Sequence, residues 1–203
     1  MIVVIDYNVG NVRSVCKAFR YLGCEVQLSS RPDEIEAAEG LVLPGVAAFG
    51  YAVGVLGSLA ELIKEIALAG KPLLGICVGH QLLFEKSFEH GEHAGLGLVK
   101  GEVVRLPAGR VIPHMGWNKV VIPEDMDLFA ALGSEKHFYF AHSYYTDVKD
   151  GSAKVAYTDY GFELPASIQK DNIYGAQFHP EKSGSAGLQV LRNFVSVCEK
   201  GNR

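Results

Sequence analysis

The first half of the chain alternates short apolar runs with segments in which apolar residues recur at helical spacing. The runs with the length of buried strands are residues 2–5, 24–28, 40–43 and 72–76. Helical spacing follows Asn11, which can cap a helix that Gly23 ends, and it returns over about residues 51–69. Strands that alternate with helices are typical of a parallel sheet with crossover connections.

The second half has a different pattern, with short runs rich in Val, Ile, Tyr and Phe between Gly, Pro and Asp. These runs indicate a more antiparallel region of sheet. They lie near residues 97–105, 117–122, 137–141, 153–158, 165–169 and 173–178. Helices are expected from Gln81 through Phe84 and over about residues 184–198. The sequence contains no repeat, low-complexity segment or linker, so we predict one α/β domain over residues 1–203.

Composition narrows the class of protein. The chain has 203 residues, of which 48% are apolar and 21% charged, as in ordinary globular proteins. Its formal net charge is -4 and it has no basic run, which argues against nucleic-acid and membrane-surface partners. Neither a signal peptide at the start nor 18 consecutive apolar residues is present in the sequence. We therefore expect a cytoplasmic protein.

Three of the four cysteines are expected to pack in the core. Cys16 and Cys198 fall on apolar helix stripes, and Cys24 opens a strand after Gly23. The cysteines follow no disulfide or metal-ligand spacing. His90 and His93 are three residues apart without a third ligand, and residues 95–97 lack the full dinucleotide fingerprint. We expect neither a metal nor a nucleotide cofactor.

The fourth cysteine has different surroundings. Residues 75–79 have the form G-x-C-x-G, with Cys77 between a predicted strand and helix. This is the thiol version of a nucleophile elbow, in which glycines keep a sharp turn free of crowding. A helix N-terminus favours the thiolate, and the neighbouring N–H groups can serve an oxyanion hole. The alternative is a buried cysteine between two turn glycines.

A second motif supplies the groups that a thiol nucleophile needs. His179 and Glu181 flank Pro180 after a predicted strand. Residues two apart in an extended segment point the same way, so a base and its orienting carboxylate can lie together. Pro180 marks the end of strand pairing. Alone, the pattern is also that of a solvated surface pair, and it gains meaning from its combination with the elbow.

Together, the two motifs resemble the class I, triad-type glutamine amidotransferases, whose fold is an open mixed, mainly parallel sheet with helices on both faces. The resemblance implies that Cys77 is the nucleophile, His179 the general base and then acid, and Glu181 the orienting carboxylate. Cys77 would attack the side-chain amide of L-glutamine, form a glutamyl thioester and release ammonia. Water would then release glutamate.

Further segments are similar to one subfamily, the glutaminase subunits of imidazole glycerol phosphate synthase in histidine biosynthesis. The most specific are M-G-W-N at residues 115–118 and H-S-Y-Y at residues 142–145; residues 6–15, 44–50 and 177–183 agree with them. The resemblance covers essentially the whole chain. It implies a heterodimer with a separate (βα)8-barrel cyclase subunit, which uses the ammonia to make imidazole glycerol phosphate and an aminoimidazole carboxamide ribotide.

The resemblance also implies roles for residues around the triad. Gly45 and Val46 lie in the loop that supplies an oxyanion-hole N–H by a peptide flip, and Val78 follows the nucleophile. The positions that hold the α-amino and α-carboxylate groups of glutamine are Gln81, Glu89, Ser143 and Tyr144. Such groups suit a zwitterion. Gln81 and Glu89 also fit ordinary exposed helix residues, and Tyr144 fits a strand aromatic.

Four residues are expected at the partner interface: Asn11, Met115, Trp117 and Asn118. A core position for Trp117 is the alternative. The sequence departs from the subfamily at Ala47, where the oxyanion loop usually has Gly, and at His80, where Met is more frequent. An alanine Cβ would hinder a flip that needs positive φ. His80 is expected to pack near the site without a catalytic role.

Three other functions are compatible with part of this pattern. The first is a glutaminase that serves a different ammonia-using synthase, and M-G-W-N argues against it. A catalytically silent binding subunit could keep the fold, although all three triad residues are present. A stand-alone cysteine hydrolase of peptides or γ-glutamyl compounds is the third.

Overall fold

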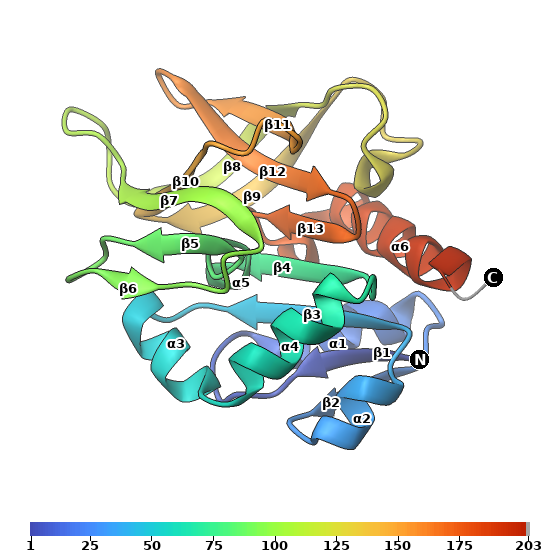
Figure 1. Cartoon of the computed structure of the whole chain (residues 1–203). Coiled ribbons are helices and arrows are strands. Elements are labelled where there is room, and N and C mark those ends of the chain that lie inside the picture. Colours follow the sequence, from blue (N-terminus) through green and yellow to red (C-terminus); the bar gives the residue numbers. More distant parts are fainter. Residues whose placement is uncertain (202–203) are drawn as a thin grey trace.

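The computed structural model describes residues 1–201 and contains a nine-stranded mixed sheet and a four-stranded sheet (Figure 1). In pairing order, the strands of the larger sheet are β2 (Val26–Ser29), β1 (Ile2–Ile5), β3 (Gly40–Gly45), β4 (Leu73–Cys77), β13 (Ile173–Ala176), β12 (Glu163–Lys170), β11 (Lys154–Asp159), β8 (His114–Val121) and β9 (Glu135–His142).

The larger sheet has a parallel half and an antiparallel half. From β2 to β13 each pairing is parallel, and from β13 to β9 each is antiparallel. Every residue of β1, β3, β4 and β13 is buried. Continuous apolar runs are what a parallel strand covered on both faces requires. The α/β class and the mixed sheet predicted from the sequence are confirmed.

Helices cover both faces of the parallel half. They are α1 (Val12–Tyr21), α2 (Pro32–Ala37), α3 (Phe49–Leu56), α4 (Leu59–Leu68), the single turn α5 (Val78–Gln81) and α6 (Gly184–Gly201), with 3₁₀ turns η1 (Asp127–Phe129) and η2 (Pro180–Lys182). Figure 1 shows α2, α3 and α4 on one face and α1 and α6 on the other. Within residues 1–201, no helix combines the length and apolarity needed to cross a membrane.

Several predicted elements differ from the structure. The helix expected over about residues 51–69 is two helices, because the chain turns at Gly57 with φ +53°. Asn11 precedes α1, but its side chain makes no capping hydrogen bond. The helix α2 and the strand β10 were not predicted, and Cys24 is only partly buried. Cys16 and Cys198 are buried as expected.

The helix expected from Gln81 through Phe84 is wrong. After α5 the chain turns and enters β5 (Phe84–Ser87), the centre of the smaller sheet. Leu82, Leu83 and Phe84 are fully buried, and their carbonyls accept N–H groups from residues 96–99. A short apolar run fits strand and helix equally, and here its distant partners decide.

The smaller sheet carries part of the site. Its order is β10 (Tyr144–Val148), β7 (Val99–Arg105), β5 and β6 (His93–Ala94). Strand β10 leaves the larger sheet after β9 and pairs antiparallel with β7. Strand β5 lies parallel to β7 on the side away from β10, so β7 joins the segment after the elbow to the segment after β9.

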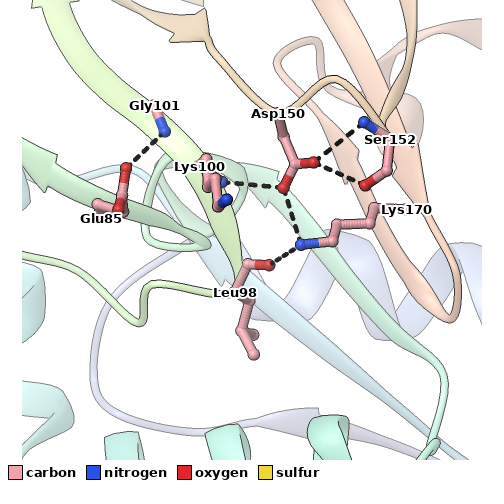
Figure 2. Close-up of polar contacts among 7 residues, drawn as sticks. All are labelled: Glu85, Leu98, Lys100, Gly101, Asp150, Ser152 and Lys170. Atoms are coloured by element: carbon pink, nitrogen blue, oxygen red, sulfur yellow. Dashed lines mark hydrogen bonds and ion pairs between the residues drawn. The ribbon is translucent and has the colours of Figure 1, made fainter.

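A polar cluster joins the two sheets (Figure 2). The buried carboxylate of Asp150 accepts hydrogen bonds from Lys170 Nζ at 2.8 Å and from the backbone N–H of Lys100 at 3.2 Å. Ser152 donates its hydroxyl at 2.6 Å and its N–H at 3.2 Å to the other oxygen. Lys170 also donates to the carbonyl of Leu98 at 3.1 Å. Lys170 ends β12 and Lys100 lies in β7, so this cluster fastens one sheet to the other.

Candidate active site

Strand β4 ends in the strained turn that the sequence predicted. Cys77 has φ +56° and ψ -111°, a conformation that a residue with a Cβ rarely adopts. A Cβ on Gly79 would lie 1.7 Å from the carbonyl oxygen of Leu43 in β3, and one on Gly75 would lie 2.5 Å from that of Gly79. Both glycines are therefore needed for the turn to pass this close to its neighbours.

The turn leads directly from the nucleophile into the start of a helix. Val78 and Gly79 form the first turn of α5, where N–H groups have no intrahelical acceptor. The helix α5 spans four residues, so its field on Cys77 comes from these first N–H groups and not from a long macrodipole.

His179 and Glu181 meet beyond the end of β13. The backbone of His179 is extended, with φ -100° and ψ 96°, and η2 begins at Pro180. His179 Nδ1 lies 2.9 Å from Glu181 Oε1, and the side chains are 3% and 1% exposed. The alternative of a solvated surface pair is therefore wrong. Ser183 fixes the segment by donating its hydroxyl to the carbonyl of His179 at 2.7 Å.

The surroundings of His179 favour its charged form. Burial lowers the pKa of His179, but hydrogen bonds to the side chains of Cys77 and Glu181 and their negative charges raise it by more, to about 9. Because Glu181 occupies Nδ1, the other ring nitrogen remains for Cys77. The arrangement places a protonated imidazole between the side chains of Glu181 and Cys77.

Cys77 and His179 border a cavity of about 430 Å³, within the usual range for small-molecule sites. Most sequence-predicted binding residues line it. These are Val46, Val78, Gln81, Glu89, Ser143 and Tyr144, together with Cys77, His179 and the expected interface residue Met115. Residues from both sheets and from the loop after β3 thus meet at one opening.

The remaining predicted binding residue, Gly45, does not line the cavity but packs against the elbow. A Cβ there would lie 2.8 Å from Val78 Cβ and 2.9 Å from the backbone nitrogen of Gly79. The next residues, Val46 and Ala47, continue to the cavity wall. Ala47 is not among the described residues with positive φ, so its Cβ is unstrained in this conformation.

Hydrogen bonds to neighbouring protein groups orient two polar side chains of the cavity, Glu89 and Gln81. Glu89 is not in a helix, and its Oε2 accepts the backbone N–H of Phe49 at 2.7 Å, where α3 begins. Gln81 is 2% exposed, and its Nε2 donates to the carbonyl of Tyr144 at 2.9 Å and to Gln177 Oε1 at 3.0 Å. Both amide hydrogens of Gln81 are used, which leaves its oxygen to face a ligand.

The residues expected at a partner interface lie outside the triad. Met115 and Trp117 on β8 are 64% and 57% exposed, so a core position for Trp117 is wrong. Asn118 lies two residues before the buried Val120 and is partly exposed. Asn11 directly precedes α1. Large exposed apolar side chains of this kind suit a protein contact.

Sequence analysis missed two residues that contact the site. Tyr7 donates its hydroxyl to the carbonyl of Pro44, the peptide that precedes the Gly45–Val46 peptide. Gln177 Nε2 lies 3.9 Å from Cys77 Sγ. Burial raises the pKa of Tyr7 far above its usual range, and the charge of Cys77 raises it further. Both lie in segments that are similar to the subfamily, residues 6–15 and 177–183, but the sequence assigned no role to either.

The histidine at the elbow packs as the sequence suggested. His80 is fully buried, its Nε2 lies 3.2 Å from Thr146 Oγ1, and burial lowers its pKa to about 3, with a further contribution from His142. Among residues 1–201, no group of three or more His, Cys, Asp and Glu side chains is arranged to hold a metal ion.

The sequence matches the glutamine amidotransferase class-I family over residues 3–198. The fold agrees: a glutamine amidotransferase crystal structure superposes with a TM-score of 0.79 at 18% identity, covering 98% of this chain and 100% of that one. PurLQS from Thermotoga maritima gives 0.78 at 23% identity, with 97% of each chain covered. The chain belongs to the class I glutamine amidotransferases.

Closer relatives define the family within this class. The imidazole glycerol phosphate synthase subunit HisH of Methanothermobacter thermautotrophicus is 49% identical over 97% of this chain and 98% of the relative. HisH of Caldanaerobacter subterraneus is 50% identical over 98% of this chain and 99% of the relative. Within its class, the chain belongs to the family of these HisH subunits.

Proposed function

We propose that this chain is the glutaminase subunit of imidazole glycerol phosphate synthase, acting in the cytoplasm as one amidotransferase domain. It hydrolyses L-glutamine to glutamate and ammonia and supplies the ammonia to a separate (βα)8-barrel cyclase subunit in histidine biosynthesis. The observation that carries the chemistry is the buried His179–Glu181 pair beside Cys77 at the wall of one cavity. Family membership supports the pathway.

The first half of the reaction forms a thioester. The thiolate of Cys77 attacks the side-chain amide carbon of glutamine, and the carbonyl electron pair moves to oxygen. His179, protonated on the nitrogen that faces Cys77, gives its proton to the amide nitrogen as the C–N bond breaks. Ammonia leaves and a glutamyl thioester with Cys77 remains. Glu181 stabilises the imidazolium through Nδ1 before this transfer.

The second half returns the enzyme to its resting form. Neutral His179 removes a proton from water, and the hydroxide attacks the thioester carbonyl. The tetrahedral intermediate then expels the Cys77 thiolate and glutamate departs, which leaves the imidazolium–thiolate pair again. The free N–H groups of Val78 and the loop of Gly45 and Val46 stabilise the oxyanion in both halves.

The polar groups around the cavity hold the rest of glutamine. Glu89 and the oxygen of Gln81 accept the α-ammonium group, and Ser143 and Tyr144 lie beside the α-carboxylate. This set suits a small zwitterion, and the cavity of about 430 Å³ has the size of a small-molecule site. The proposal therefore favours glutamine over the peptide substrates of a stand-alone cysteine hydrolase.

The partner docks on the face that carries Met115 and Trp117, with Asn118 and Asn11 at the same interface. Met115 lines the cavity as well as being exposed, so this face adjoins the glutamine site. An aromatic and a thioether anchor at the mouth of a site are suited to close it when a partner binds.

Glutamate release from glutamine tests the proposal. The chain is measured alone, with purified cyclase subunit, and with cyclase plus its ribonucleotide substrate. We expect low activity alone and strong stimulation in the last mixture. Cys77-dependent hydrolysis without any stimulation would assign the chain to a different synthase. Absence of hydrolysis in all three mixtures would leave the silent-subunit alternative.

A further inference from the structure

A continuous series of hydrogen bonds runs from the β8 surface to the nucleophile, and we call it the relay. Its side chains are, in order, Asn118, His114, His142, Gln81 and Gln177, and the carbonyl of Tyr144 links His142 to Gln81. The distances are 3.3 Å from Asn118 to His114, 2.9 Å from His114 to His142 and 2.9 Å from His142 to the Tyr144 carbonyl. From that carbonyl, Gln81 and Gln177 continue the relay to Cys77 Sγ.

The first link has a fixed direction. The N–H of Lys119 donates to Asn118 Oδ1 at 2.8 Å, and Asn118 Nδ2 donates to the carbonyl of Asp159 at 2.9 Å. The side-chain amide of Asn118 therefore cannot be reversed without loss of both contacts. Its second amide hydrogen is the donor to His114, which makes His114 Nε2 an acceptor.

The direction of the remaining links follows from the first. With Nε2 as acceptor, neutral His114 carries its hydrogen on Nδ1 and donates it to His142 Nε2. His142 then carries its hydrogen on Nδ1 and donates it to the carbonyl of Tyr144. Each imidazole accepts at Nε2 and donates from Nδ1, so both share one tautomer and one polarity.

Packing holds the two imidazoles in place. His114 and His142 are register partners across β8 and β9 and are 3% and 6% exposed. The ring of His114 stacks on Phe140, with centroids 4.6 Å apart, and on Tyr160, with centroids 4.0 Å apart. Burial lowers the pKa of both histidines, to about 4 for His114 and about 3 for His142, which keeps both neutral.

The inner end of the relay sets the groups that face the substrate and the nucleophile. The Tyr144 carbonyl accepts one hydrogen bond from His142 and one from Gln81, which uses both of its lone pairs. Gln81 gives its second hydrogen to Gln177 Oε1. This fixes the amide of Gln177 so that its Nε2 points to Cys77 Sγ.

We propose that His114 and His142 are positioning residues that hold Gln81 and, through Gln177, the nucleophile Cys77 in their working orientation. The inference rests on the proposed glutaminase function. It assigns to the M-G-W-N segment a second task besides partner contact, because Asn118 of that segment is the outer end of the relay. Partner docking at Met115 and Trp117 thus reaches the site through side chains that are already hydrogen-bonded to it.

Two substitutions of His142 separate the relay from simple packing. His142→Asn keeps an amide donor at the place of Nδ1, whereas His142→Phe keeps an aromatic ring and removes both nitrogens. Asn118→Leu removes the outer donor. Glu135→Gln is the matched control on the same strand pair, because Glu135 is exposed and bonds Lys119 away from the relay. Each variant is assayed in the complex with the cyclase subunit, with glutamine and with ammonium salt, and its Tm is measured.

We expect His142→Phe to lower kcat/KM for glutamine about tenfold and Asn118→Leu to lower it about threefold, because each loses a buried hydrogen bond. His142→Asn recovers much of the His142→Phe loss, through both kcat and KM. Turnover of these variants with ammonium salt stays at the wild-type level. The Glu135→Gln control keeps the wild-type kcat/KM for glutamine. Equal activity of His142→Asn and His142→Phe, or losses shared by the ammonium reaction and following Tm, would overturn the relay.

A second readout does not depend on glutamine turnover. The rate at which iodoacetamide alkylates Cys77, followed by mass spectrometry of its peptide, is expected to fall in His142→Phe and to recover in His142→Asn. If the wild type alkylates Cys77 but releases no glutamate in complex, the proposed function fails and the relay is still tested. If all variants alkylate at one rate, the relay fails although the glutaminase stands.

Discussion

Glu181 has one carboxylate oxygen on His179 and no hydrogen-bond partner for the other among the described residues. A buried carboxylate with a single partner depends on that partner for its charge compensation. Together with the larger effect of Cys77, this carboxylate raises the pKa of His179 to about 9 in spite of burial. The same pair gives the site a pH-dependent share of stability.

The substitution Glu181→Gln should reveal the pH-dependent stability that the His179–Glu181 pair contributes. The folded-state pKa of His179 is raised above its unfolded value, so the stabilisation is complete below about pH 6.5 and is lost as pH rises through about 9. We expect the difference in unfolding free energy between wild type and Glu181→Gln, from urea titrations, to shrink between pH 6.5 and 9. A difference that stays constant over this range would contradict the charged pair.

Ala47 is the second residue-scale feature. If the oxyanion loop must visit positive φ there, glycine removes a conformational cost of about 1 kcal/mol, which corresponds to about a fivefold increase in the rate of glutamine hydrolysis. We therefore expect Ala47→Gly to raise glutamate release by the chain without its partner. Ala48→Gly is the control for general loosening of the loop, and an equal rise in both variants would rule out a specific role of position 47.

At the scale of elements, the elbow can pack against β3 only because residue 79 is a glycine. Gly79→Ala would place a Cβ into the backbone of β3 and should cost about 3 kcal/mol or more of unfolding free energy. Gly54→Ala is the matched control, since no atom lies within 4 Å of a Cβ there in the exposed part of α3. It should stabilise the chain by about 0.5–1 kcal/mol. Equal effects in chemical denaturation would contradict the account.

The elements that sequence analysis found are those with long, continuous patterns. The parallel strands β1, β3 and β4 were predicted because their apolar runs are fully buried. Helix α1 was predicted because its buried residues recur at helical spacing, and the elbow because its glycines are fixed by sterics. The helix expected at Gln81 through Phe84 was wrong because the run's partners are residues 96–99, which no local pattern reveals. The break at Gly57 was overlooked because a single glycine also occurs inside helices.

The site shows the same division. Cys77, His179 and Glu181 were placed together from two short motifs, and the structure brings Cys77 and His179 to one cavity wall with Glu181 hydrogen-bonded behind His179. Tyr7 and Gln177 were missed because their contacts join residues 37 and 96 positions apart, respectively to Pro44 and Gln81. Such hydrogen bonds depend on the strand order, and the strand order cannot be read from the spacing of residues in the sequence.

At the scale of the whole molecule, the site depends on how the two sheets are joined. Residues Ser143 and Tyr144 enter the cavity from the segment that leads into the smaller sheet, while Cys77 comes from the larger one. The cluster of Asp150, Lys170 and Lys100 fastens the sheets on their far side (Figure 2). The hydrogen bond from Lys170, and after it those from Ser152 and Lys100, hold the pKa of Asp150 far below its usual range in spite of desolvation.

Asp150→Asn should lower the unfolding free energy by about 1.5–3 kcal/mol at pH 7, because a buried charged hydrogen bond is lost. The folded-state pKa of Asp150 is depressed, so its contribution is present above about pH 4 and fades as pH falls below that value. The difference from wild type should therefore narrow in acid. Asp147→Asn, which breaks an exposed pair with Lys149, is the control and should change stability by less than about 1 kcal/mol.

The most direct test of the central claim is Cys77→Ala assayed in the complex with the cyclase subunit. Product formation is measured once with glutamine and once with ammonium salt as the nitrogen source. The account predicts that turnover with glutamine is abolished while turnover with ammonium salt continues at the wild-type rate, because only the ammonia supply is lost. Retained glutamine-dependent turnover, or loss of both activities in a folded variant, would contradict it.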